Sequence, residues 1–175
     1  MFVWIGCQLP EGFSEQLRSC CRENAPCGLD FSGFTLPQHI SLKISFDAGE
    51  RSGQILDAVE ALLRGENGFS VIPRRICREG RILWVEFVEN ATLRHLHDLL
   101  DRELEGRFGV QQHMFDRNFR FHSTLCMGAE EALELLNARL ADFPLPGELP
   151  VSTFLLGLSE SGKSGTYRVV RTVKV

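Results

Sequence analysis

The sequence predicts an α+β fold of two pseudo-symmetric lobes, each an antiparallel sheet with helices on its outer face. Segments in which apolar and polar residues alternate, as in half-buried strands, are interspersed with segments in which apolar residues recur every three or four positions, as in amphipathic helices. The order strand–helix–strand–helix–strand occurs twice, with an extra strand at the end. The 175 residues are 43% hydrophobic and 24% charged, which is typical of a globular chain. We therefore expect one domain, residues 1–175, made of two intertwined lobes.

The elements of the first half follow from these two periodicities. They are a buried strand at 2–9, a helix at 13–21, an alternating strand at 36–46, a helix at 55–63 and a strand at 69–76. Gly65 marks the end of the second helix, because glycine is common just after the last helical turn. The second half repeats this order.

The second half opens with a strand at 82–88, and Asn90 is placed to cap the helix that follows. The remaining elements are the longest helix at 93–104, an alternating strand at 119–127, a helix at 133–140, and a closing hairpin of strands 151–158 and 167–175. Each half thus has an alternating strand as its third element, and each of these two strands contains a histidine.

Composition narrows the class of function. The net charge of −4, from 19 basic and 23 acidic residues, argues against general coating of duplex DNA and leaves room for a local basic patch. Six cysteines without a Cys-x-x-Cys pair exclude zinc-ribbon and thioredoxin-like sites and indicate reduced thiols. The apolar start of the chain ends at Pro10, which is too short for a signal peptide or a membrane span. We expect a cytoplasmic monomer that does not bind membranes.

The two histidine-bearing strands carry the same pattern, His39-Ile-Ser41-Leu and His122-Ser-Thr124-Leu, 83 positions apart (122 − 39). Residues i and i+2 of a strand point to one face, so each strand presents one imidazole and one hydroxyl to the same side. The same alternation adds Lys43 to the first group and Arg120 to the second, as candidate contacts for substrate charge. We expect both histidines on neighbouring central strands that face one cleft.

This set of side chains suits the opening of a cyclic phosphate. One neutral imidazole can deprotonate water while a second, protonated imidazole donates a proton to the leaving oxygen. The hydroxyls of Ser41 and Thr124 can donate to the phosphate oxygens on which charge accumulates. We predict no metal and no cofactor, because no carboxylate cluster accompanies the histidines in the sequence. Which histidine is the acid and which the base stays open.

With these motifs the sequence resembles the two-histidine (2H) phosphoesterase superfamily, which includes bacterial 2′-5′ RNA ligase-like proteins and RNA 2′,3′-cyclic phosphodiesterases. Besides the motif pair, the resemblance covers the Phe2–Pro10 opening, the Arg81–Phe87 strand and the Gly165–Val170 close. It implies two pseudo-symmetric α+β lobes with a cleft between them. The chain departs from many such members by having Ser41 in place of threonine, and Cys126-Met127 where an arginine often follows the second motif.

The resemblance implies a metal-independent phosphodiesterase that hydrolyses 2′,3′-cyclic phosphate at an RNA 3′ end or on a small nucleotide, with reversible 2′-5′ ligase activity in some members. Two alternatives stay open: trimming of RNA 3′ ends or cleavage of another nucleotide phosphodiester, and a non-catalytic nucleotide- or RNA-binding module on the same fold. Retention of both histidines and both hydroxyls favours the enzyme, since a binding module has less need of two titratable groups.

Three further signals need separate interpretation. The stretch Gly157–Ser164 has the residue pattern of a phosphate-binding P-loop. That loop requires a helix after it, and a strand-like segment follows instead. Basic residues surround a predicted turn, at positions 74, 75, 78 and 81. Arg75 and Arg78 are candidate contacts for the substrate phosphate; the alternative is that all four residues lie on a solvent-exposed hairpin without a binding role. His95 and His97 lie in a helical pattern, where positions i and i+2 face different directions, so we expect a solvated helix face.

Overall fold

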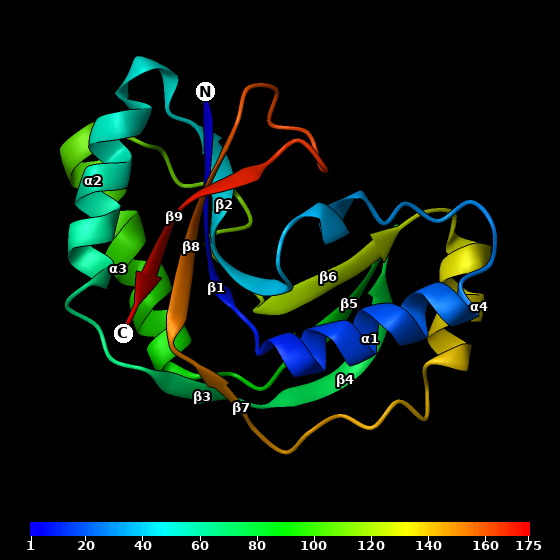
Figure 1. Ribbon diagram of the computed structural model, residues 1–175. Helices are drawn as coiled ribbons and strands as arrows, with labels where there is room; N and C mark the ends of the chain where they lie inside the picture. The colour runs from blue at the N-terminus through cyan, green and yellow to red at the C-terminus, as the bar shows by residue number, and fades with distance from the viewer.

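The computed structural model describes residues 1–175 and contains two main antiparallel sheets (Figure 1). The larger has the order β2 (His39–Asp47), β1 (Phe2–Gln8), β8 (Thr153–Ser159), β9 (Arg168–Lys174). The smaller has the order β4 (Pro73–Glu79), β5 (Ile82–Phe87), β6 (His122–Met127). A short pair, β3 (Phe69–Val71) with β7 (Leu149–Val151), completes the strands. The predicted α+β class with antiparallel sheets is confirmed.

Four helices cover the sheets in pairs. The helices α2 (Ser52–Leu63) and α3 (Ala91–Phe108) pack on the four-stranded sheet, while α1 (Glu11–Asn24) and α4 (Glu130–Arg139) lie together beside the three-stranded sheet (Figure 1). Two short 3₁₀ turns, η1 (Ser32–Thr35) and η2 (Gly49–Arg51), flank β2. Helix α1 follows β1 of the larger sheet but lies beside the smaller one, and α3 follows β5 of the smaller sheet but packs on the larger one. Each sheet is therefore covered by one helix that comes from the other lobe.

The boundaries of α3 illustrate how local sequence sets an element. The side chain of Asn90 accepts hydrogen bonds from the amides of Thr92 and Leu93, at 2.9 and 3.0 Å, so the predicted N-cap is confirmed. Gly109 ends the helix in the left-handed conformation, with φ of 67°, which glycine adopts without steric cost. Between them Leu93, Leu96, Leu100 and Leu104 are fully buried.

One hydrophobic cluster of 37 buried residues joins the two lobes, because it draws side chains from both main sheets and all four helices. The six cysteines are free thiols, and Cys7, Cys21 and Cys126 are buried within this cluster. None of the helices combines the length and hydropathy that a membrane-spanning helix needs.

Several predicted strands differ in extent from the observed ones. The strands predicted at 36–46 and 119–127 begin at His39 and His122, so each histidine is the first residue of its strand. Pro37, which has no amide hydrogen, and the preceding turn η1 keep the chain out of the ladder before His39. The strand predicted at 69–76 is two strands, because the chain changes partner from β7 to β5 after Val71.

The stretch Gly157–Ser164 forms the end of β8 and the hairpin tip that leads to β9, as predicted. No helix follows Ser164, so the backbone amides that would hold a nucleotide phosphate in a P-loop are not assembled. The tip instead contacts η1, where the hydroxyls of Ser32 and Ser164 are hydrogen-bonded at 3.0 Å.

Candidate active site

The two histidine motifs meet where the two main sheets touch. Strand β2 is an edge of the larger sheet and β6 is an edge of the smaller one, and the two strands lie against each other. Gln38 bridges them, since its buried side-chain amide donates to the Ser123 hydroxyl at 2.7 Å and to the Thr124 carbonyl at 2.8 Å. The histidines are therefore brought together by two sheet edges, and the expectation of neighbouring central strands was wrong.

Both imidazoles are held in the same way. The Nδ1 atom of His39 donates to the carbonyl of Pro37 at 2.7 Å, and that of His122 donates to the carbonyl of Arg120 at 2.7 Å. A carbonyl can only accept, so Nδ1 carries the hydrogen and Nε2 is the nitrogen left for proton transfer. Each ring also lies against a tryptophan, with centroids 4.3 Å apart for Trp4–His39 and 4.2 Å for Trp84–His122.

The two hydroxyls are held differently. Ser41 Oγ accepts a hydrogen bond from Trp4 Nε1 at 3.0 Å. Thr124 lies two residues after His122 on β6, so its side chain points to the same face of the strand as the histidine. Its neighbour on β5 is Trp84. The Trp84 indole donates instead to Cys77 Sγ, at 3.1 Å.

Burial separates the acid–base properties of the two histidines. The pKa of His39 is lowered to about 4, mainly because burial disfavours the charged ring; the nearby His122 and Arg18 add to this, and the Pro37 carbonyl opposes it. The pKa of His122 is also lowered by burial and by Arg120, while the Arg120 carbonyl and Glu79 oppose the shift. His39 is therefore neutral at neutral pH.

Two of the four predicted cationic contacts lie on the face that bears His122. Arg120 pairs with Glu79 and with Glu86, the latter at 3.0 Å, and its guanidinium lies 5.3 Å from the Trp84 ring centroid. Arg75 pairs with the same Glu86 at 2.8 Å. Both arginines are exposed, and both have carboxylate partners that an incoming phosphate would have to replace.

Arg78 lies on the opposite face of the smaller sheet. Its guanidinium pairs with Glu130 at 3.5 Å and Glu134 at 3.0 Å, both on α4. Arg75 and Arg78 are three positions apart on β4, and side chains an odd number of positions apart point to opposite faces. The prediction that Arg78 contacts substrate is thus corrected: this residue connects the sheet to α4.

Lys43 is also displaced from the predicted face. The pairing of β2 with β1 shifts register between Ser41 and Lys43, so both Leu42 and Lys43 are buried. A bulge of this kind breaks the alternation of side chains. The Lys43 ammonium pairs with Asp101 at 2.6 Å and with Asp116, and its side chain is 2% exposed. Lys43 is therefore a buried ion-pair partner, and the prediction that it binds substrate is corrected.

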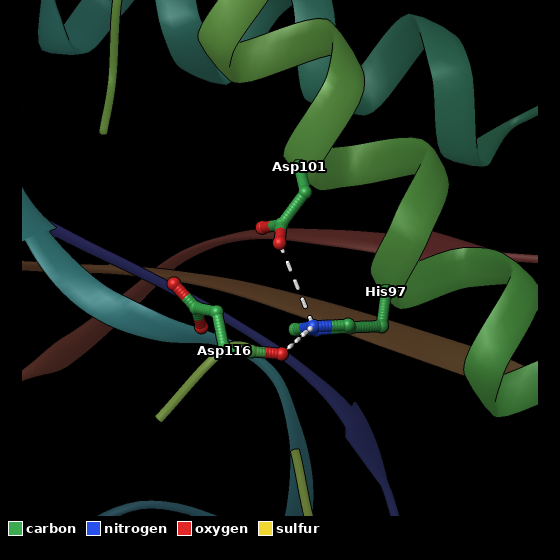
Figure 2. A group of neighbouring side chains, drawn as sticks. All are labelled: His97, Asp101 and Asp116. Atoms are coloured by element: carbon green, nitrogen blue, oxygen red, sulfur yellow. Dashed lines mark hydrogen bonds and ion pairs between the residues drawn. The ribbon is translucent and has the colours of Figure 1, made fainter. Parts of the chain in front are cut away.

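The buried group around Lys43 includes His97, which was expected on a solvated helix face and is 1% exposed. Its Nδ1 faces the Leu42 carbonyl at 2.7 Å, and its Nε2 lies 3.1 Å from the Asp116 carbonyl and 3.6 Å from Asp101 (Figure 2). His97, Asp101 and Asp116 are close enough to hold a metal ion, but the Lys43 ammonium already supplies a positive charge to both carboxylates.

A cavity of about 520 Å³ adjoins this buried group and does not include either motif histidine. Its lining is entirely polar: Arg94, His97, Asp98, Asp101, Gln112, Asp116, Arg117 and Asn118. The candidate active site is thus defined by the junction of β2 and β6, and this polar cavity lies elsewhere.

Sequence reasoning missed three contributors to the site. Gln38 and Glu86 act through partners that are far away in sequence, so no local pattern reveals them. Trp4 lies in the strand predicted to be buried at 2–9, which its 6% exposure bears out, but it also contacts both members of the first motif. The sequence feature that could have indicated this contact is the position of Trp4 on β1, which the predicted topology placed in the first lobe.

The chain shares its fold with the solved structures of TT0787, LigT and Usb1, so the fold that the resemblance implied is confirmed. TT0787 of Thermus thermophilus is 21% identical, with a TM-score of 0.70 over 99% of this chain and 97% of that one. LigT of E. coli, solved with 3′-AMP, gives 21% identity and 0.69 over 99% and 97%. Usb1 of Kluyveromyces marxianus gives 10% and 0.53 over 99% and 98%. No family model and no curated protein matches the chain.

Proposed function

We propose that this protein is a metal-independent phosphodiesterase that hydrolyses 2′,3′-cyclic phosphates on RNA ends or small nucleotides. The observation that carries the proposal is the pair of equivalent imidazoles at the β2–β6 junction. Each has its Nδ1 hydrogen held by a backbone carbonyl two residues earlier and its Nε2 left for proton transfer. Two such groups at one place are what acid–base cleavage of a phosphodiester needs.

The pKa order suggests how the roles divide in hydrolysis. His39, with the pKa of about 4, is the neutral ring and acts as the base that deprotonates water. His122 lies near Glu79, whose charge favours the protonated ring, and acts as the acid that protonates the leaving ribose oxygen. Resynthesis of the phosphodiester would exchange these roles, so the same site supports ligation in reverse.

The hydroxyls and arginines provide for the charge of the phosphate. Ser41 and Thr124 donate hydrogen bonds to its non-bridging oxygens, and Arg120 and Arg75 attract it to this face. Crystal structures of E. coli LigT with 3′-AMP, NADP⁺ and ATP support a nucleotide substrate. We further propose that residues 1–175 act as one unit, since each lobe contributes one histidine and one hydroxyl.

A hydrolysis assay in EDTA tests the proposal. The panel contains 2′,3′-cyclic mononucleotides, oligonucleotides that end in a cyclic phosphate, and linear dinucleotides. We expect the cyclic phosphates to be opened, and His39→Ala or His122→Ala to reduce kcat/KM by about 10²–10⁴-fold, the usual scale for loss of one acid or base. The double variant should lose much less than the product of the two single losses, because both rings serve one step.

The matched control is His95→Ala, which removes an exposed histidine from α3 and should leave the rate unchanged. Full activity in either single motif variant, or activity that is lost in EDTA and restored by zinc or manganese, would overturn the two-histidine mechanism. Binding of the cyclic phosphate without turnover by the wild-type chain would favour the non-catalytic alternative.

A further inference from the structure

Trp4 and Ser41 form the one direct side-chain hydrogen bond to a motif hydroxyl, at 3.0 Å from Trp4 Nε1 to Ser41 Oγ. We propose that Trp4 is a positioning residue that orients the Ser41 hydroxyl so that its hydrogen is donated to a phosphate oxygen of the substrate. This inference rests on the proposed phosphodiesterase function and adds to it a residue that was otherwise only part of the core.

The chemistry of a serine hydroxyl explains the effect. Oxygen offers one hydrogen to donate and two lone pairs to accept. The indole N–H can only donate, so it occupies a lone pair of Ser41 Oγ and leaves the hydroxyl hydrogen free to point elsewhere. A phosphate oxygen at the β2–β6 junction would be a suitable acceptor for it.

Serine needs this help more than threonine does. The γ-methyl group of a threonine restricts rotation about χ1, whereas a serine can turn its hydroxyl among all three staggered positions. On β6 the hydroxyl belongs to Thr124, and the neighbouring Trp84 donates its N–H to Cys77 Sγ at 3.1 Å. The two lobes thus fix their hydroxyls by different means: a hydrogen bond for Ser41 and a side-chain methyl for Thr124.

The Trp4 indole is itself held rigidly, which a positioning residue requires. Its ring lies on Gly6 and Gly157, where an added Cβ would come within 2.6 Å of Trp4 Cζ2 and 2.7 Å of Cε3. The ring packs against His39 in a T-shaped arrangement, with an interplanar angle of 64°, and Leu36 and Leu155 pack beside it. The indole cannot turn toward another acceptor without displacing these neighbours.

The first test is Trp4→Phe, which keeps an aromatic ring and removes the N–H, combined with each of three states of residue 41. With wild-type Ser41 we expect kcat to fall about tenfold with little change in KM, a fraction of the loss typical of a whole oxyanion donor. In the Ser41→Thr background the same change should cost much less, and in Ser41→Ala nothing further. Trp84→Phe is the matched control, and its cost should not depend on residue 41.

A second measurement is independent of activity. The chain has two tryptophans, so ¹⁵N-labelled protein gives two indole N–H signals. Ser41→Ala should move one of them strongly and Cys77→Ala the other. If Trp4→Phe does not fold, benzothienylalanine at position 4 keeps the shape of the indole and removes only the N–H.

The possible results are distinct. An equal loss from Trp4→Phe in all three backgrounds, or no loss beside wild-type Ser41, would overturn the positioning role while leaving the phosphodiesterase proposal intact. The positioning role would also be overturned if neither indole N–H signal shifts in the Ser41→Ala variant. A wild-type chain without phosphodiesterase activity would instead show that the proposed function fails, whatever the indole signals report.

Discussion

The side-chain amide of Gln38 donates a 2.8 Å hydrogen bond to the main-chain carbonyl of Thr124, and so ties the strand that begins with His39 to the strand that begins with His122. Its second hydrogen goes to the buried Ser123 hydroxyl at 2.7 Å, and its oxygen accepts from Arg18 at 3.3 Å. Gln38 immediately precedes β2 of the larger sheet, and both acceptors of its amide hydrogens lie on β6 of the smaller sheet, so this one side chain fixes the spacing of the two motifs.

Replacing Gln38 should therefore affect both stability and rate. Gln38→Leu leaves buried polar groups on β6 without a partner, so we expect unfolding to become easier by about 1–3 kcal/mol. We also expect kcat for cyclic-phosphate hydrolysis to fall, since the two histidines lose their fixed spacing. Urea unfolding and steady-state kinetics measure the two effects, with the exposed Gln54→Leu on α2 as the control. A Gln38→Leu variant with wild-type stability and kcat would show that β2 and β6 are held together without this bridge.

The pH dependence of the reaction should be displaced toward acid. Catalysis in the proposed direction needs neutral His39, above its pKa of about 4, and protonated His122, below a pKa that is itself lowered from 6.5. We expect kcat/KM to follow a bell between these limits, on the acid side of the neutral optimum that unperturbed imidazoles would give. Bound phosphate favours the protonated ring, so the kcat profile should extend to higher pH. A kcat/KM maximum above about pH 7 would contradict this assignment.

Burial of His39 should also make the folded protein less stable in acid. Between pH 6.5 and 4 the unfolded chain takes up a proton on His39 that the folded chain does not, so the free energy of unfolding falls as the pH is lowered through this window. The contribution of this residue is at most about 3 kcal/mol, since each pKa unit corresponds to about 1.4 kcal/mol. Chemical unfolding at neutral pH and at about pH 5 measures it. His39→Gln should flatten the dependence, and His95→Gln, at an exposed site, should not.

Lys43 should matter for folding and not for substrate binding. Lys43→Met leaves the carboxylates of Asp101 and Asp116 buried without their cation, a change that typically costs about 3–5 kcal/mol. We expect a large drop in thermal and urea stability, and an unchanged KM for the molecules that remain folded. Lys163→Ala, at the exposed hairpin tip, is the control and should leave stability unchanged. A stable Lys43→Met variant with a raised KM would restore the substrate-binding role.

The hairpin tip should not act as a nucleotide-triphosphate site. Without a helix after Ser164, the stretch Gly157–Ser164 cannot surround a β-phosphate with backbone amides. Isothermal titration with Mg-ATP should therefore show no binding that depends on Lys163. Saturable micromolar binding that is lost in Lys163→Ala and unaffected by His39→Ala would show that the tip is a separate phosphate site.

Much of the fold and the chemical centre could be read from the sequence, because these features depend on local periodicity. Alternation placed the imidazole and hydroxyl of each motif on one strand face, and the repeated order of elements predicted two lobes. Asn90 caps its helix as expected. The alternating pattern of the residues after Ser164 predicted a strand there in place of a helix, and a strand is observed. Such signals involve residues within a few positions of one another, so the chain reveals them without its tertiary structure.

Tertiary structure decided which polar side chains reach the site. A bulge in β2 places the Lys43 side chain in the core, where it pairs with Asp101. On β4, Arg78 points to the face of the sheet that α4 covers. The bridge from Gln38 to Thr124 spans 86 residues, and the indole of Trp4 reaches Ser41 across 37. Register shifts and long-range hydrogen bonds depend on which strands become neighbours, and that choice is made by burial of the whole core, which no local pattern encodes.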